Sequence, residues 1–78
     1  MYIVEVKIKG VDETRTFNTE VEVIQFYLSM CKGIIENSNF TFAITSIVYY
    51  HKGSLIPHKL EYSNSGVRLI RGAKMNEE

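Results

Sequence analysis

Residues 18–36 limit what this chain can fold into more than any other segment, because they read as one helix that is apolar over most of its surface. At a rotation of about 100° per residue, one apolar stripe collects Ile24, Leu28, Cys31 and Ile35, with Val21 and Tyr27 at its flanks. Further apolar residues extend around the helix, namely Val23, Phe26, Met30 and Ile34. The polar residues are left with an arc of about 100°, which is the width that the apolar stripe has on a typical surface helix. The helix therefore carries more apolar surface than a chain of 78 residues is expected to cover.

The beginning of this helix is marked by Thr19 and Glu22, which have the spacing of a capping box. The Thr19 hydroxyl can accept a hydrogen bond from the backbone N–H of residue 22, while the Glu22 carboxylate can reach back to the N–H of residue 19. Asn37, Ser38 and Asn39 follow the last apolar residues and are expected to end the helix.

Before the helix, the sequence predicts a β-hairpin. Residues 2–9 alternate between apolar and polar side chains, which is the period of a half-buried strand. A turn at 10–13 and a short antiparallel strand at 14–17 complete the hairpin.

After the helix, three more strands are predicted, over residues 40–50, 56–62 and 67–71. Tight turns at Lys52-Gly53 and at 63–66 separate them. The chain is therefore predicted to have two strands before the helix and three after it.

The element order β-β-α-β-β-β predicts an α+β fold, a two-layer sandwich in which one helix packs on an antiparallel sheet. Residues 1–72 are expected to form this single domain, followed by a flexible C-terminal tail at 73–78. Pro57 lacks a backbone N–H, which indicates that its strand is an edge or carries a bulge at that point. The expected core consists of Val4, Val6, Ile8, Ile24, Leu28, Cys31, Ile35, Phe42, Ile44, Val48 and Leu60.

The residues of this chain do not indicate a catalytic centre. Cys31 is the single cysteine and lies on the apolar stripe of the helix, where a thiol is a small hydrophobe rather than an activated nucleophile. Cys31, His51 and His58 do not have the spacing of a zinc site. The acidic residues fall in natural solvent positions, and the sequence has no glycine-rich phosphate loop. We therefore expect no enzyme activity, no catalytic residues, no cofactor and no metal.

Nine Lys and Arg residues balance nine Asp and Glu residues, so the chain as a whole has no field that attracts nucleic acid or an anionic membrane. Basic residues nevertheless outnumber acidic ones over residues 37–76. An alternative function is therefore nucleic-acid binding by the C-terminal strands, through His51, Lys52, His58, Lys59, Arg68 and Arg71. Such side chains can bind phosphate while tyrosines stack on bases, but the sequence has neither a G-x-x-G loop nor an RNP signature.

The sequence also bears on the cellular compartment. No run of apolar residues reaches the length of a membrane span. The N-terminus passes directly into an alternating strand with Glu5 and Lys7, which is unlike a signal peptide. A single thiol fits a reducing compartment, so we expect a cytoplasmic protein.

The function that best fits these features is a non-catalytic protein–protein interaction module. We expect a homodimer that acts as an inhibitor or adaptor on a larger partner protein, in the style of the small accessory proteins of phages and mobile elements. The partner or dimer interface is predicted at Val23, Phe26, Met30, Ile34, Ile47 and Tyr49. Alternatively, Val23, Phe26 and Met30 are covered within the chain, by residues 40–45 or by the C-terminal tail.

Overall fold

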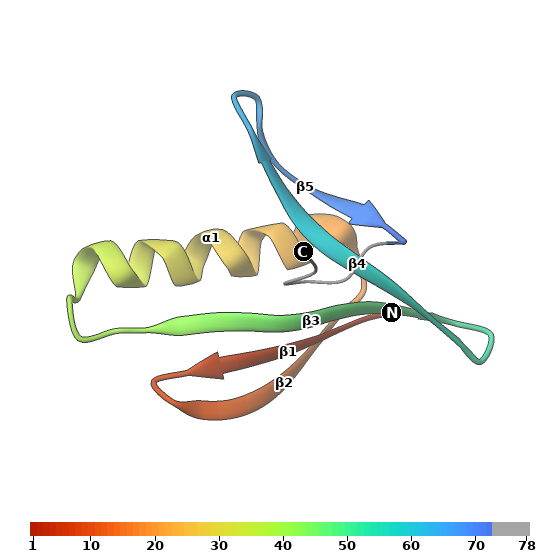
Figure 1. Ribbon diagram of the computed structural model, residues 1–78, viewed down its shortest axis with the longest axis horizontal. Helices are drawn as coiled ribbons and strands as arrows, with labels where there is room; N and C mark the ends of the chain where they lie inside the picture. Colours follow the sequence, from red (N-terminus) through yellow and green to blue (C-terminus); the bar gives the residue numbers. More distant parts are fainter. Residues whose placement is uncertain (73–78) are drawn as a thin grey trace.

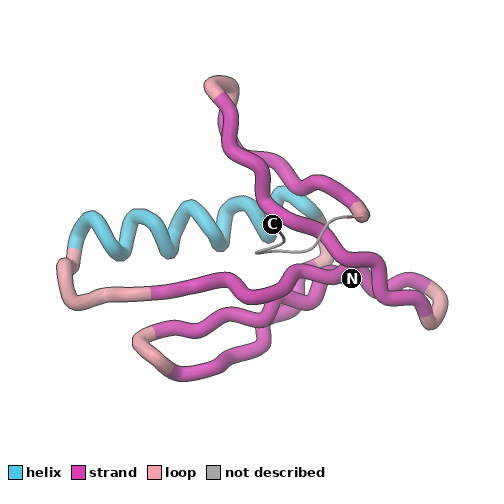
Figure 2. The backbone as a smooth tube through the Cα atoms, in the orientation of Figure 1, coloured by secondary structure: helices cyan, strands magenta, loops and turns pink. Residues whose placement is uncertain are grey.

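The computed structural model describes residues 1–72, which form one helix packed on a five-stranded sheet (Figures 1 and 2). In chain order, the elements are β1 (Tyr2–Ile8), β2 (Val11–Phe17), α1 (Glu20–Glu36), β3 (Phe42–His51), β4 (Ser54–Ser63) and β5 (Gly66–Arg71). The strands lie in the order β2-β1-β3-β4-β5, and all neighbours are antiparallel. The predicted α+β class and element order are confirmed. The tail predicted at 73–78 lies outside the described residues.

The first two hairpins turn on the same dipeptide, Lys-Gly. Lys9 and Gly10 have φ angles of 51° and 81°, and Lys52 and Gly53 have 49° and 81°. Positive φ at both central residues is the signature of a type I′ turn, whose twist matches that of the flanking strands. The first turn therefore needs only two residues, and β2 begins at Val11 rather than at residue 14, so the predicted turn at 10–13 is wrong.

The helix begins where the capping box predicts. The backbone N–H of Glu22 donates to the Thr19 hydroxyl at 3.2 Å, and the N–H of Thr19 donates to the Glu22 carboxylate at 3.0 Å. At the other end, the N–H of Asn37 donates to the carbonyl of Gly33. The two ends are thus satisfied locally, which fixes the helix at Glu20–Glu36.

A β-bulge in β3 changes which of its side chains face the helix. Val6 pairs with Ile44, whereas Glu5 pairs with Ser46, so Thr45 is the extra residue. Beyond the bulge the parity is reversed, and Ile47 comes to the helix side opposite Val4. The core position predicted for Val48 is therefore wrong, because the bulge turns that side chain to the other face of the sheet.

The core lies between the sheet and one side of α1. Its buried residues are Val4, Val6, Val23, Phe26, Ile44, Ile47 and Leu60. Phe26 packs with its ring centroid 5.3 Å from that of Phe17, and the Arg15 guanidinium lies 5.7 Å from the Phe26 centroid. The predicted core positions of Leu28 and Ile35 are wrong, because α1 is rotated so that its Val23–Phe26 side meets the sheet.

Gly33 lies where the ring of Phe40 packs against α1. A Cβ atom at this position would lie 3.0 Å from the ring of Phe40, which is tighter than nine in ten real Cβ contacts, so the ring would have to shift by a few tenths of an ångström. The missing side chain lets Phe40 pack directly on the last turns of α1, and Phe40 in turn stacks near Phe42 with ring centroids 6.3 Å apart. The chain therefore leaves the helix on the side that faces β3.

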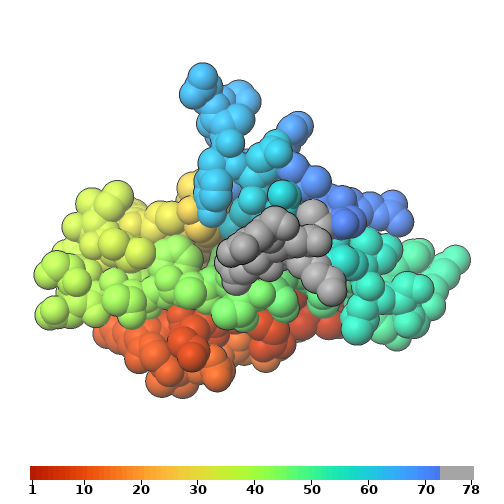
Figure 3. Space-filling model, viewed as in Figure 1, coloured from red at the N-terminus to blue at the C-terminus, as the bar shows by residue number. Residues whose placement is uncertain are grey.

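Pro57 lies where β4 becomes an edge strand, as its missing N–H predicts. The N–H of Gly72 donates to the Pro57 carbonyl at 2.8 Å, and the pairing of β4 with β5 begins only at His58 and Arg71. The first residues of β4 therefore lie beyond the end of β5. The opposite end of the β4–β5 hairpin projects from the body of the molecule beside α1 (Figure 3).

Candidate protein-binding surface

The side of α1 that does not meet the sheet carries a second apolar stripe, which we call the α1 seam. It consists of Val21, Ile24, Leu28, Cys31 and Ile35. Val21, Leu28 and Ile35 are 61%, 49% and 84% exposed, while Ile24 and Cys31 are partly buried. These are the residues that the sequence places on one stripe. The structure leaves that stripe at the surface within residues 1–72.

The spacing of the α1 seam is that of a coiled-coil contact. Its residues are separated by alternating steps of three and four, so Val21, Leu28 and Ile35 take the a positions of a heptad. Ile24 and Cys31 take the d positions. Apolar side chains at a and d form the seam along which one helix packs into the holes of another. Nothing in the sheet requires this regularity, because the sheet meets the other side of the helix.

Charges differ at the two ends of the α1 seam. Glu20 and Glu22 lie in the first turn, where they suit the positive end of the helix dipole. Lys32 lies near the C-terminal end and is exposed, with its Nζ 3.6 Å from a Glu36 oxygen. The first turn of α1 therefore presents two carboxylates, whereas the other end presents Lys32 paired with Glu36.

Tyrosines separate the α1 seam from the core on the β4–β5 side. The Tyr27 ring centroid lies 5.9 Å from that of Phe42 and 5.6 Å from that of Tyr62. Burial, followed by hydrogen bonds with Cys31 and Tyr62, raises the pKa of Tyr27 above its usual value. The seam is therefore a stripe with a defined aromatic boundary rather than a continuation of the core.

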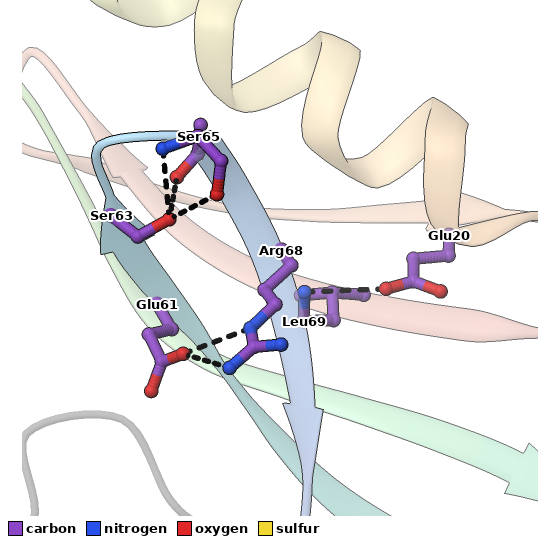
Figure 4. Close-up of polar contacts among 7 residues, drawn as sticks. Glu20, Glu61, Ser63, Ser65, Arg68 and Leu69 are labelled. Atoms are coloured by element: carbon purple, nitrogen blue, oxygen red, sulfur yellow. Dashed lines mark hydrogen bonds and ion pairs between the residues drawn. The ribbon is translucent and has the colours of Figure 1, made fainter.

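Glu20 also links the start of α1 to the edge of the sheet. One carboxylate oxygen of Glu20 accepts a hydrogen bond from the backbone N–H of Leu69 at 3.3 Å (Figure 4). The same view shows Arg68 donating to Glu61 on the neighbouring strand. The outer edge of β5 is thus partly closed by the helix.

A second apolar patch lies on the sheet face that turns away from α1. Ile3, Val48 and Pro57 form one row across β1, β3 and β4, and Tyr50 pairs with Leu55 in the next row. Tyr50 and Leu55 are exposed, and the other three are half-buried. The patch is less regular than the α1 seam, and it has no charge pattern that would orient a partner.

The structure places most of the predicted interface residues inside the protein. Val23, Phe26 and Ile47 belong to the buried core, and Met30 packs against it. Tyr49 is half-buried between Tyr2 and His58, and only Ile34, at 43% exposed, is open to a partner. The alternative that the chain itself covers Val23 and Phe26 applies, since both belong to the core cluster with residues of β1, β3 and β4, while the tail named in that alternative lies outside the described residues. The apolar side chains that α1 leaves exposed are therefore Ile34 and the exposed members of the α1 seam, not Val23 or Phe26.

The structure does not bring the predicted basic surface together. His58 and Arg71 face the helix side of the sheet, whereas Lys59 and Arg68 face the opposite side. Arg68 is also paired, with a nitrogen 2.6 Å from a Glu61 oxygen. Lys52 lies in the β3–β4 turn and His51 at its base. These six residues therefore do not offer one continuous path for a phosphate backbone.

The remaining candidates for chemistry are separated from one another. His58 is buried, and its Nδ1 lies 3.0 Å from the carbonyl oxygen of Ile56, which can only accept, so Nδ1 carries the proton. The ring of Tyr2 stands edge-on to it at 5.6 Å. Within residues 1–72, no group of three or more His, Cys, Asp or Glu side chains is placed to hold a metal ion. His58 is therefore a buried residue of the core whose Nδ1 has a hydrogen-bond partner.

Comparisons of the chain with protein-family models, with curated proteins and with solved structures find no match. Among the described residues, α1 is the only helix, and it is too short and too polar to cross a membrane.

Proposed function

We propose that this protein is a non-catalytic protein–protein interaction module, which works as a homodimer and acts as an inhibitor or adaptor on a larger partner protein. The α1 seam carries the proposal. Contiguous exposed apolar residues on a small protein normally mark a binding surface. Here Val21, Leu28 and Ile35 are exposed at a regular spacing that a second helix can use.

The partner that fits the α1 seam is an amphipathic helix of the larger protein. Full burial of a Val, Leu or Ile side chain contributes roughly 1.5–3 kcal/mol, so the three exposed side chains can contribute most of a moderate affinity. The acidic first turn of α1 favours an antiparallel helix that carries basic residues near its own C-terminal end. Recognition then follows the helix-in-groove mode, with anchors at intervals of three and four residues.

The test uses a photo-crosslinking side chain at position 28 in the full chain, with position 29 as the matched control. Ser29 is exposed on the polar arc of the same helix turn. We expect one protein to be crosslinked from position 28 and not from position 29, through a peptide whose apolar residues have helical spacing. Leu28→Glu should abolish recovery of that protein, and Ser29→Glu should retain it.

Two results would contradict the proposal. Recovery of the same protein by the wild type and by Leu28→Glu would show that the α1 seam is not the contact. Recovery of nucleic acid alone would favour the alternative function, in which binding falls steeply with salt as counterions are released.

A further inference from the structure

Strand β2 ends the sheet on the side away from the β4–β5 hairpin, and its outer edge is open within the described residues. Ile8 and Val11 flank a two-residue turn, so they form a hydrogen-bonded pair. The backbone groups of Asp12, Thr14 and Thr16 therefore point away from β1. Within residues 1–72, none of these three N–H groups donates a hydrogen bond. By contrast, the outer edge of β5 is partly closed by Glu20.

The sequence of β2 is complementary to itself when it is read in the antiparallel direction. Thr14 is the central residue of the seven-residue strand, and a two-fold axis through it pairs Thr14 with its own copy. In this register Glu13 lies opposite Arg15 of the second copy, and Asp12 lies opposite Thr16. At the ends of the strand, Val11, which is 59% exposed, lies opposite Phe17. One register therefore matches every pair along the full length of the strand.

We propose that two copies of this chain pair through their β2 edges and form one continuous ten-stranded antiparallel sheet. The inference rests on the proposed function, since it names the surface through which the expected homodimer forms. Asp12, Thr14 and Thr16 supply the backbone hydrogen bonds of the new ladder. Glu13 and Arg15 then fall at a position where opposite side chains approach most closely, because that pair is not hydrogen-bonded through its backbone.

Glu13 and Arg15 suit this use because they lie on one face of the strand, whereas Asp12 lies on the other face and pairs with Lys7. The Arg15 guanidinium already lies 2.7 Å from the Glu13 carboxylate of its own strand. In the dimer each guanidinium also meets the carboxylate of the other copy, so two pairs become a network of four charges. Cross-strand pairs of opposite charge stabilise antiparallel sheets, whereas like charges in the same place destabilise them.

The two-fold axis of such a dimer is perpendicular to the sheet, because that is the rotation that joins identical antiparallel strands edge to edge. Both copies of α1 therefore lie on the same face of the ten-stranded sheet. The two α1 seams are then displayed together, which allows one dimer to bind two helices of an assembly with increased avidity.

The test is a charge exchange that needs two variants of the full chain, Glu13→Arg and Arg15→Glu. Each variant alone places like charges opposite one another, and we expect its dimerisation to weaken at least about tenfold in sedimentation equilibrium. An equimolar mixture restores opposite charges across the two-fold axis and should form a heterodimer. The Glu13–Arg15 contact within each strand remains broken in both variants, so restored association in the mixture reports only the contact between copies.

A second variant and a control distinguish this inference from the proposed function. Thr14→Pro removes an outward N–H without removing a bond to β1, and it should also yield a folded monomer. The double variant Leu28→Glu, Ile35→Glu should remain dimeric, because it changes only the α1 seam. A wild-type protein that stays monomeric at high micromolar concentration, or a mixture that stays monomeric, would overturn the β2 pairing and leave the partner-binding role of the seam intact. Loss of the dimer in the seam variant would also overturn it, by placing self-association on α1.

Discussion

The two apolar sides of α1 differ little in composition and greatly in burial. On the side that meets the sheet, Val23 is fully buried and Phe26 is 9% exposed. On the α1 seam, Leu28 and Ile35 are about half and more than four-fifths exposed. Hydrophobicity alone therefore does not decide which side of a helix enters the core. The difference comes from shape, because Phe26 fits beside Phe17 and Gly33 admits the ring of Phe40.

The largest expected difference between the two sides is in stability. Phe26→Ala should lower the free energy of unfolding by about 3–5 kcal/mol, because it leaves a cavity next to Phe17 and removes the ring under Arg15. Ile35→Ala removes a side chain that is already in solvent, and its effect should stay within about 0.5 kcal/mol. Urea unfolding of the two variants in parallel measures the contrast. Equal losses would show that the α1 seam is also a core surface.

A substitution at Gly33, near the C-terminal end of α1, should also lower the stability of the protein, but by less than Phe26→Ala. Gly33→Val should cost about 1–3 kcal/mol, since the new side chain would overlap the Phe40 ring. Ser29→Val, on the exposed polar arc, is the matched control and should change stability little. Thermal unfolding followed by circular dichroism compares the two. If both variants unfold together, the close approach of Phe40 to the helix does not contribute to stability.

Much of the fold could be predicted from local chemistry. The capping box at Thr19 and Glu22 predicted the helix start, and alternation together with turn residues predicted the five strands, because these signals depend on nearby residues. The Lys-Gly turn at Lys9 and Gly10 was missed, although positive φ at Gly10 is what a two-residue hairpin requires. Element boundaries depend on such turn geometry more than on hydrophobicity.

The rotation of α1 and the surfaces that follow from it could not be predicted from periodicity. Two apolar sides of similar width compete for one sheet, and the choice between them depends on long-range packing. The bulge at Thr45 brings Ile47 to the helix side, and the interruption of alternation by Ser46 was its sequence signal. The excess of apolar surface was predicted, but its location was not. The self-complementary order of Val11–Phe17 could have been read from the sequence, once that segment was known to be an edge strand.

The smallest expected effect is a dependence of stability on pH. It comes from two tyrosines that pack on the helix side of the sheet. Burial raises the pKa of Tyr27 above its usual value of 10.0, and burial together with Glu20 and Tyr49 raises that of Tyr2. In the unfolded chain both phenols ionise near pH 10, whereas in the folded protein they keep their protons to higher pH. Their contribution to stability is therefore complete below about pH 10 and decreases as the pH rises beyond it.

Tyr27→Phe isolates this contribution. The variant lacks the ionisable hydroxyl, so its free energy of unfolding should fall less steeply than that of the wild type between pH 9.5 and about 11.5. Ile35→Ala, on the α1 seam, should follow the wild-type slope, because it changes no group that titrates. Urea unfolding at half-unit steps of pH measures all three slopes under the same conditions. Identical slopes for the wild type and Tyr27→Phe would mean that the Tyr27 phenol is as accessible to water in the folded protein as in the unfolded chain. In that case the aromatic boundary between the core and the α1 seam would be open in solution, and the two sides of α1 would not be as distinct as their burial indicates.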